Sequence, residues 1–180
     1  MKEEPPPTHL CTESIGVFED ILQRGLSLSL RATGKSMTPF LRGTEILTIK
    51  KVPSATLSIG DLIFFKTLDE VPVIHRIVKK QRERNGVIFL TKGDSLLGFD
   101  APIGEGHILG KVYGVHRDGR NGNAEEIDME SCPQRFLNYI TAVFSLAKTR
   151  IYAAAVKVLP PFVRLAIKKV FLQAYTLRLV

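Results

Sequence analysis

Four side chains in the first hundred residues have the types that acyl-transfer chemistry uses: Ser36, His75, Asp94 and Asp100. A serine hydroxyl is a weak nucleophile until a neighbouring base accepts its proton. Histidine, with an ordinary pKa of about 6.5, is suited to that task near neutral pH. Each of these residues also has a plain structural interpretation, in a turn, in a strand core or in a solvated loop. Their chemistry therefore depends on whether the fold brings them together.

The stretch around Ser36 predicts that its hydroxyl lies outside any regular strand. Residues 26–31 alternate leucine with polar residues, which is typical of a strand with one buried face. Gly34 then interrupts the extended pattern, and Pro39 lacks the N–H that a continuing strand would need. Ser36 is therefore expected in a short turn.

The middle of the chain predicts an all-β body. Short apolar or alternating runs recur there with turn residues and no helical pattern between them, and a charged turn is expected at residues 79–85. The expected strands are 26–31, 45–50, 62–66, 71–78, 86–91 and 107–115. This spacing favours a barrel or a coiled sheet. A β domain is accordingly expected over residues 26–117, and it contains all four candidate residues.

The flanking segments have different patterns. Residues 13–24 are amphipathic and predict a short helix, with Thr12 as its N-cap and Gly25 as its C-terminal stop. Together with the proline-rich start of the chain they make an N-terminal unit of residues 1–25. Residues 118–133 are rich in glycine, asparagine and acidic residues, a composition typical of a linker.

A basic helical tail is expected over residues 134–180. Helical periodicity predicts one helix at 135–155 and a second at 162–180, separated by Pro160 and Pro161. The net charge of +7 belongs to this region, because residues 131–180 contain eight basic and no acidic side chains. The remainder, with seventeen basic and eighteen acidic residues, is nearly neutral, so nucleic acid is not an expected partner.

The tail has three interpretations: helices packed on the β body, a docking surface for a peptide or partner, or a segment that lies on an anionic membrane surface. The third is favoured, because cationic, aromatic and aliphatic side chains together are typical of interfacial helices. The longest uncharged stretch, residues 136–147, has 12 residues, whereas about 20 are needed to span a bilayer.

Compartment and cofactors follow from what the sequence contains. Cys11 and Cys132 are far apart and have neither metal-ligand nor disulfide-framework spacing, which indicates a reducing compartment. Residues 1–12 have no apolar core of a signal peptide or anchor. A cytoplasmic protein is expected, soluble or peripheral on the inner face of the membrane, with no metal and no cofactor.

Five motifs in order resemble a known clan. Gly34-Lys35-Ser36-Met37-Thr38-Pro39 is similar to the Ser-Met box of the signal peptidases and LexA-type repressors. Ile59–Lys66 is similar to the clan's Gly-Asp-x-Val-x-Phe strand, and Val73–Val78 is similar to its His-Arg strand. Phe89–Asp94 is similar to the Thr-Lys-Gly-Asp box, which Asp100 follows. Ile108–Val112 is similar to the closing Gly-Lys strand. The match covers residues 28–116 and most resembles the archaeal and endoplasmic-reticulum branch, because bacterial signal peptidases carry Lys-Arg in place of His-Arg.

This resemblance implies a coiled β-barrel and a serine endopeptidase that cleaves a leader, precursor or signal-type peptide. Ser36 would be the nucleophile and His75 the general base, and an aspartate would orient the imidazole. Asp100 is the first choice for that role and Asp94 the second.

Three departures keep two alternatives open. Thr44 stands where the family has aspartate, Phe99 replaces the first of a paired aspartate, and the family's N-terminal transmembrane helix has no counterpart in the sequence. One alternative is a LexA-like self-cleaving regulator, although no helix-turn-helix pattern precedes Ser36 and that branch uses lysine as the base. The other is a catalytically inactive, membrane-associated binding module.

Overall fold

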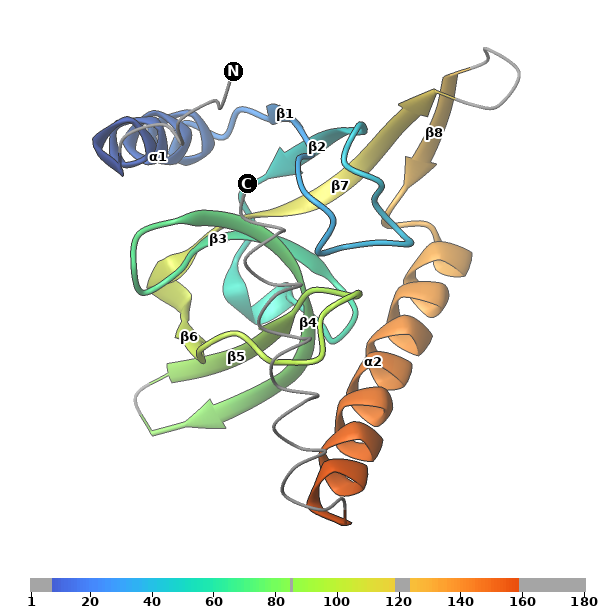
Figure 1. Ribbon diagram of the computed structural model, residues 1–180. Helices are drawn as coiled ribbons and strands as arrows, with labels where there is room; N and C mark the ends of the chain where they lie inside the picture. Colours follow the sequence, from blue (N-terminus) through green and yellow to red (C-terminus); the bar gives the residue numbers. More distant parts are fainter. Residues whose placement is uncertain (1–7, 85, 119–123, 159–180) are drawn as a thin grey trace, which may run out of the picture.

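The part of the chain that the structure describes is mainly β, with one antiparallel sheet and two helices. The computed structural model describes residues 8–84, 86–118 and 124–158 (Figure 1). The helices are α1 (Thr8–Gln23) and α2 (Cys132–Val158), with two short 3-10 turns, Ser54–Thr56 and Glu105–His107. The strands are β1 (Leu28–Arg31), β2 (Ile46–Lys50), β3 (Leu62–Lys66), β4 (Pro72–Glu83), β5 (Gly86–Lys92), β6 (Ile103–Gly104), β7 (Ile108–Asp118) and β8 (Ala124–Asp128).

The strand order is β1-β2-β7-β3-β4-β5-β6, with β8 added to β7. The long strand β4 pairs with a different neighbouring strand in each half. The first half of β4 pairs with β3, its second half pairs with β5, and Arg76 is opposite both Leu62 and Lys92. Because the order ends at β1 on one side and at β6 on the other, the sheet is open. The described strands therefore form a coiled antiparallel sheet, and the closed form of the predicted barrel is not observed.

The sheet separates two apolar clusters, and β3 lies between them. Leu62 and Phe64 point into one cluster together with α1, β1 and β2, whereas Ile63 and Phe65 point into the other with β4, β5 and β6. Successive side chains of a strand point to opposite faces, so a strand buried on both faces must be apolar throughout. The uninterrupted Leu-Ile-Phe-Phe run of β3 meets this requirement.

The N-terminal helix is longer than its periodicity predicts. It begins at Thr8, so Thr12 lies inside the helix and the predicted N-cap is wrong. The predicted stop is confirmed: Gly25 has a φ of +75°, its N–H donates to Leu22 O at 3.1 Å, and the Leu26 N–H donates to Ile21 O at 3.3 Å. Glycine adopts this left-handed conformation without a steric cost.

Two segments predicted as irregular are strands. The charged residues 79–83 continue β4 in a hairpin with β5 instead of forming a turn. Within the predicted linker 118–133, residues 119–123 lie outside the described residues, residues 124–128 form β8 with Ile127 opposite Val115 of β7, and residues 132–133 begin α2. Both segments are polar because much of their side-chain surface is exposed to solvent. Their composition therefore resembles that of loops although their backbones are paired.

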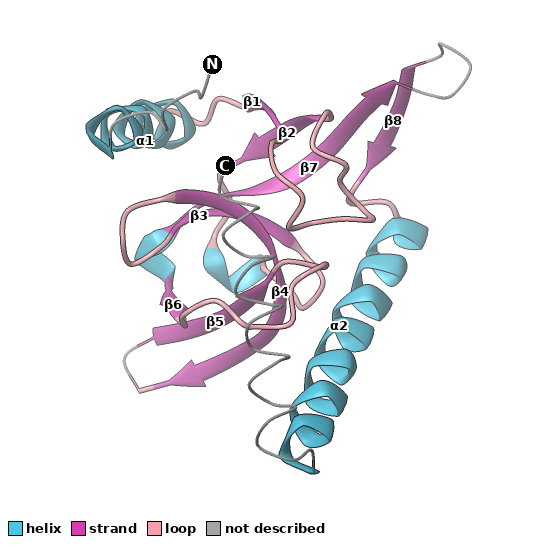
Figure 2. Cartoon of the chain, in the orientation of Figure 1, coloured by secondary structure: helices cyan, strands magenta, loops and turns pink. Residues whose placement is uncertain are grey.

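Helix α2 confirms the first predicted tail helix and runs along one side of the sheet, where it contacts β4 (Figure 2). The second predicted helix, residues 162–180, lies outside the described residues. Neither helix of the described chain is both long and apolar enough to cross a membrane.

Candidate active site

Ser36 lies in the loop between β1 and β2, as the Gly34 and Pro39 signals predict. Gly34 has a φ of +81°, and the turn is closed by a hydrogen bond of 3.2 Å from the Thr38 N–H to Lys35 O. The Ser36 side chain is partly exposed, whereas Met37 behind it is buried. The buried methionine anchors the turn and leaves the serine hydroxyl at the surface of the body.

A second turn, after β5, holds the Ser36 backbone in place. The Ser36 carbonyl accepts hydrogen bonds from the Ser95 N–H at 2.9 Å and from the Ser95 hydroxyl at 3.0 Å. Gly93 makes this contact possible, because a Cβ at that position would lie 2.7 Å from the Ser36 carbonyl oxygen. The glycine of the Thr-Lys-Gly-Asp motif thus allows a close backbone approach to the serine turn.

Glu45 supports the same loop from the other side and was missed by the sequence reasoning. Its buried carboxylate accepts the N–H groups of Arg42, Gly43 and Thr44 at 2.9–3.0 Å. Burial raises the pKa of this carboxyl, but the backbone hydrogen bonds outweigh burial and the net pKa is lowered. Glu45 therefore places a hydrogen-bonded carboxylate in this loop, one residue after Thr44. The signal for it was an acidic residue directly after a Gly-Thr turn.

His75, on β4, forms a short hydrogen bond of 2.7 Å from Nδ1 to Asp100 Oδ2. The same carboxylate oxygen accepts the Thr91 hydroxyl at 2.7 Å, and the Asp100 N–H donates to Thr91 O at 3.0 Å. Burial raises the pKa of Asp100, yet the hydrogen bond and charge of His75, with help from Thr91 and Lys92, leave it below its ordinary value. With Nδ1 on Asp100, the other ring nitrogen, Nε2, is left for a further partner.

One cleft of about 550 Å³ brings three of the four predicted residues together: Ser36, His75 and Asp100 all line it. Ser36 and His75 share the cleft without a direct hydrogen bond between them. The rest of its wall is largely apolar and includes Phe18, Leu30, Met37, Phe64, Ile74 and Leu96. An apolar groove with a few convergent polar groups has the character of a ligand-binding or active site.

Asp94, the fourth predicted residue, serves a different partner. Its two carboxylate oxygens accept the Nε and Nη2 groups of Arg76 at 2.8 and 2.7 Å, and both side chains are almost fully buried. Arg76 also donates to Gly60 O at 2.9 Å and to Asn138 Oδ1 of α2 at 3.1 Å. The choice between the two aspartates therefore falls to Asp100 as the residue in contact with the imidazole.

Lys92 is a second buried cation that the sequence reasoning did not single out. It is fully buried, and its ammonium group donates to the Ser145 hydroxyl of α2 and to Gly93 O. Burial, with a smaller contribution from the charge of Lys148, lowers the pKa of Lys92 to about 8. Lys92 does not line the cleft, whereas His75 does. The polar positions recurring along the tail helix, Asn138 and Ser145 among them, were the signal for these contacts.

Among the described residues, no three histidine, cysteine or acidic side chains lie close enough to hold a metal ion. No protein-family model matches the sequence, and no curated protein matches it either.

Proposed function

We propose that this protein is a serine endopeptidase of the signal-peptidase type, in which Ser36 is the nucleophile, His75 the general base and Asp100 the residue that orients the imidazole. The observation that carries the proposal is the 2.7 Å contact between His75 and Asp100 in the same cleft that Ser36 lines. The order of the parts also supports it: serine in the loop after β1, histidine on β4 and aspartate after β5.

The proposed reaction begins with transfer of the Ser36 proton to His75 Nε2 as the hydroxyl oxygen attacks a peptide carbonyl. The imidazolium returns the proton to the leaving amine, and an acyl-enzyme forms on Ser36. Water, deprotonated by the same imidazole, then hydrolyses the ester. The lowered pKa of Asp100 keeps its carboxylate ionised at neutral pH, where it stabilises the imidazolium and fixes the tautomer with Nε2 as acceptor.

The mostly apolar wall of the cleft suits a peptide segment with small or apolar side chains, such as a leader, precursor or signal-type peptide. Among the described strands β1 pairs only with β2, so such a segment would pair with the other edge of β1, beside the serine loop. A LexA-like regulator is less well supported, because the side chain that contacts Asp100 in the cleft is a histidine, His75, whereas that branch uses lysine as the base.

The test is acylation of the purified full chain by serine-reactive probes, including β-lactam and penem acylators, read by intact mass. A single adduct is expected on the wild type and none on Ser36→Ala or His75→Ala. Asp100→Asn should slow acylation by about 100-fold or more, because the imidazole loses its orienting charge. Ser29→Ala, which removes an exposed serine from β1, is the matched control and should label like the wild type.

Labelling that persists in Ser36→Ala would contradict the proposed nucleophile. Absence of any adduct on folded wild-type protein, with circular dichroism as the check of folding, would contradict the enzyme and favour a binding module.

A further inference from the structure

Helix α2 presents its polar side to the sheet. Asn138, Ala142, Ser145 and Thr149 are all buried, and their spacing of four, three and four residues places them on one face. Two of them accept hydrogen bonds from buried cations, Asn138 from Arg76 and Ser145 from Lys92. A helix on the surface of a globular protein ordinarily buries its apolar face, so the polarity of α2 is inverted.

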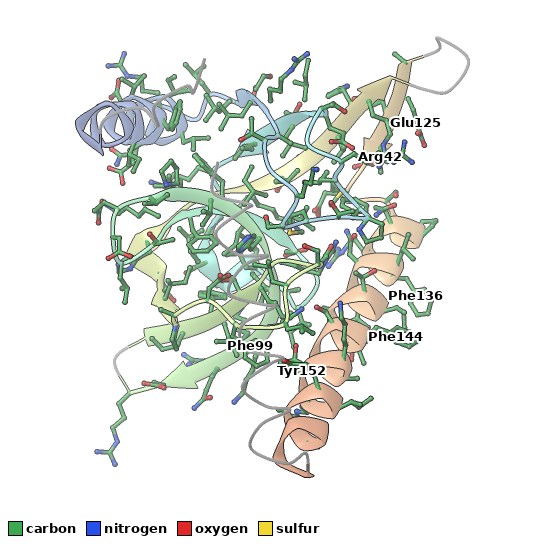
Figure 3. All side chains as sticks on the ribbon, viewed as in Figure 1. Arg42, Phe99, Glu125, Phe136, Phe144 and Tyr152 are labelled. Atoms are coloured by element: carbon green, nitrogen blue, oxygen red, sulfur yellow. The ribbon has the colours of Figure 1, made fainter. Side chains whose placement is uncertain are left out.

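The opposite face of α2 is an apolar stripe, consisting of Phe136, Ile140, Val143, Phe144, Ala147 and Ile151. These positions follow the spacing of one helical face at 3.6 residues per turn. Phe136, Phe144 and Ile151 are 68–70% exposed. In Figure 3, Phe136 and Phe144 extend from α2 away from the sheet. Isolated exposed apolar residues are common, but a continuous apolar stripe is typical of an interaction surface.

Exposed basic residues flank this stripe. On a helical wheel Lys148 falls on one side of it, and Arg135 and Arg150 fall on the other. All three are exposed, and none forms a salt bridge with a described residue. No acidic side chain occurs anywhere in residues 131–180. The surface is therefore apolar at its centre and positive at both margins.

We propose that the apolar stripe of α2 lies on an anionic lipid surface, with the helix axis in the plane of the interface. Lipid matches both properties, since acyl chains accept the aromatic side chains and anionic headgroups accept the flanking cations. A second copy of the chain matches only the first, because two copies of α2 would bring the same positive charges together. This binding is independent of the proposed peptidase chemistry, so failure of one leaves the other standing.

The chain contains no tryptophan, so a single introduced tryptophan reports on its own position. Phe144→Trp in the full chain should shift its emission to the blue on addition of phosphatidylcholine vesicles containing 30% phosphatidylglycerol, and brominated lipids should quench it. Leu68→Trp, at an exposed position in the β3–β4 turn, is the control and should do neither. An emission spectrum of the Phe144→Trp variant that these vesicles leave unchanged would overturn the proposal.

Vesicle co-sedimentation of variants measures the contributions of the apolar stripe and of the flanking basic residues separately. Phe136→Ser with Phe144→Ser should weaken binding by tenfold or more, whereas Val17→Ser with Leu68→Ser, which removes two exposed apolar side chains elsewhere, should leave it unchanged. Arg135→Gln with Lys148→Gln and Arg150→Gln should weaken binding to anionic vesicles at least about tenfold and make it less sensitive to salt.

Equal binding by the double serine variant and the wild type would overturn the proposal. So would a lipid-free wild-type dimer, seen by sedimentation equilibrium, that becomes monomeric in the double serine variant, because the stripe would then be a contact between copies.

Discussion

Asp94 and Asp100 lie in the same loop region, yet each carboxylate has its own side-chain partner. Asp100 contacts the imidazole of His75 at the edge of the cleft, whereas Asp94 neutralises the buried guanidinium of Arg76. Neighbouring residues on β4 thus bind different aspartates, because successive side chains of a strand point to opposite faces. Removing either carboxylate should accordingly have a different consequence, loss of chemistry for Asp100 and loss of stability for Asp94.

Asp94→Asn should lower the free energy of unfolding by about 3 kcal/mol or more, because it leaves the buried charge of Arg76 without its counter-ion. Urea denaturation measures the change. Asp69→Asn removes an exposed aspartate and should stay within about 0.5 kcal/mol of the wild type. Equal stability of the two variants would show that Gly60 O and Asn138 alone satisfy Arg76.

At the scale of elements, close packing between α2 and the loop before β3 requires a glycine at position 60. Gly60 precedes β3 with a φ of +100°, and a Cβ there would lie 2.8 Å from backbone atoms of Asn138 and Tyr139. Its carbonyl accepts a hydrogen bond from Arg76, which also donates to Asn138. The glycine of Ile59-Gly60-Asp61 therefore does more than form a turn, because it allows α2 to pack closely against the loop before β3.

Gly60→Ala should lower the free energy of unfolding by more than backbone strain alone would. The new methyl group would clash with backbone atoms of α2, which cannot move aside as a flexible side chain could. Gly86→Ala is the matched control: its φ of +133° is also unfavourable for alanine, but a Cβ there meets nothing within 4 Å. The control should lose about 1–3 kcal/mol, and Gly60→Ala should lose roughly 1 kcal/mol more from the clash. Urea denaturation gives both values, and limited proteolysis should show α2 becoming accessible only in Gly60→Ala.

At the scale of the whole molecule, two buried cations connect the sheet to α2. Arg76 reaches Asn138, and Lys92 reaches Ser145 about two helical turns further along. Arg76 donates to a carboxylate, whereas the hydrogen-bond acceptors of Lys92 are a hydroxyl and a carbonyl, and burial lowers the pKa of Lys92 to about 8. The free energy of unfolding should therefore depend on pH through the Lys92 ammonium group between about pH 8 and 10.5.

The direction of this pH dependence follows from the number of protons that the folded and unfolded states bind at Lys92. Between pH 8 and 10.5 the unfolded chain binds a proton at Lys92 that the folded protein has released, so the free energy of unfolding rises with pH across this window. Below about pH 8 the penalty of burying the charge is fully present. Relative to Lys92→Met, the wild type should gain about 3 kcal/mol from pH 7 to 10.5.

Urea denaturation of wild type and Lys92→Met across that range measures the difference, and Lys79→Met controls for loss of an exposed lysine. Parallel pH profiles for wild type and Lys92→Met would contradict the prediction.

Much of the local structure was determined by the sequence alone. Gly34 and Pro39 predict the turn that carries Ser36, Gly25 predicts the end of α1, and the apolar run of residues 62–66 predicts strand β3. These features depend on φ preference, missing N–H groups and side-chain periodicity, which are properties of neighbouring residues. For the same reason the local sequence predicts irregular structure at residues 79–83 and at β8, because strand pairing on an exposed edge leaves little trace in composition.

Only the tertiary structure decided which side chains meet. The contact between His75 and Asp100 depends on how β4 pairs with β5 and on the course of the loop after β5. The sequence does not specify either, so it leaves the choice between Asp94 and Asp100 open. The orientation of α2 was open in the same way. Its sequence contains a polar and an apolar face, but the sheet beneath it presents Arg76 and Lys92, and buried cations require oxygen acceptors. The polar face therefore turns inward, and the aromatic face remains outside.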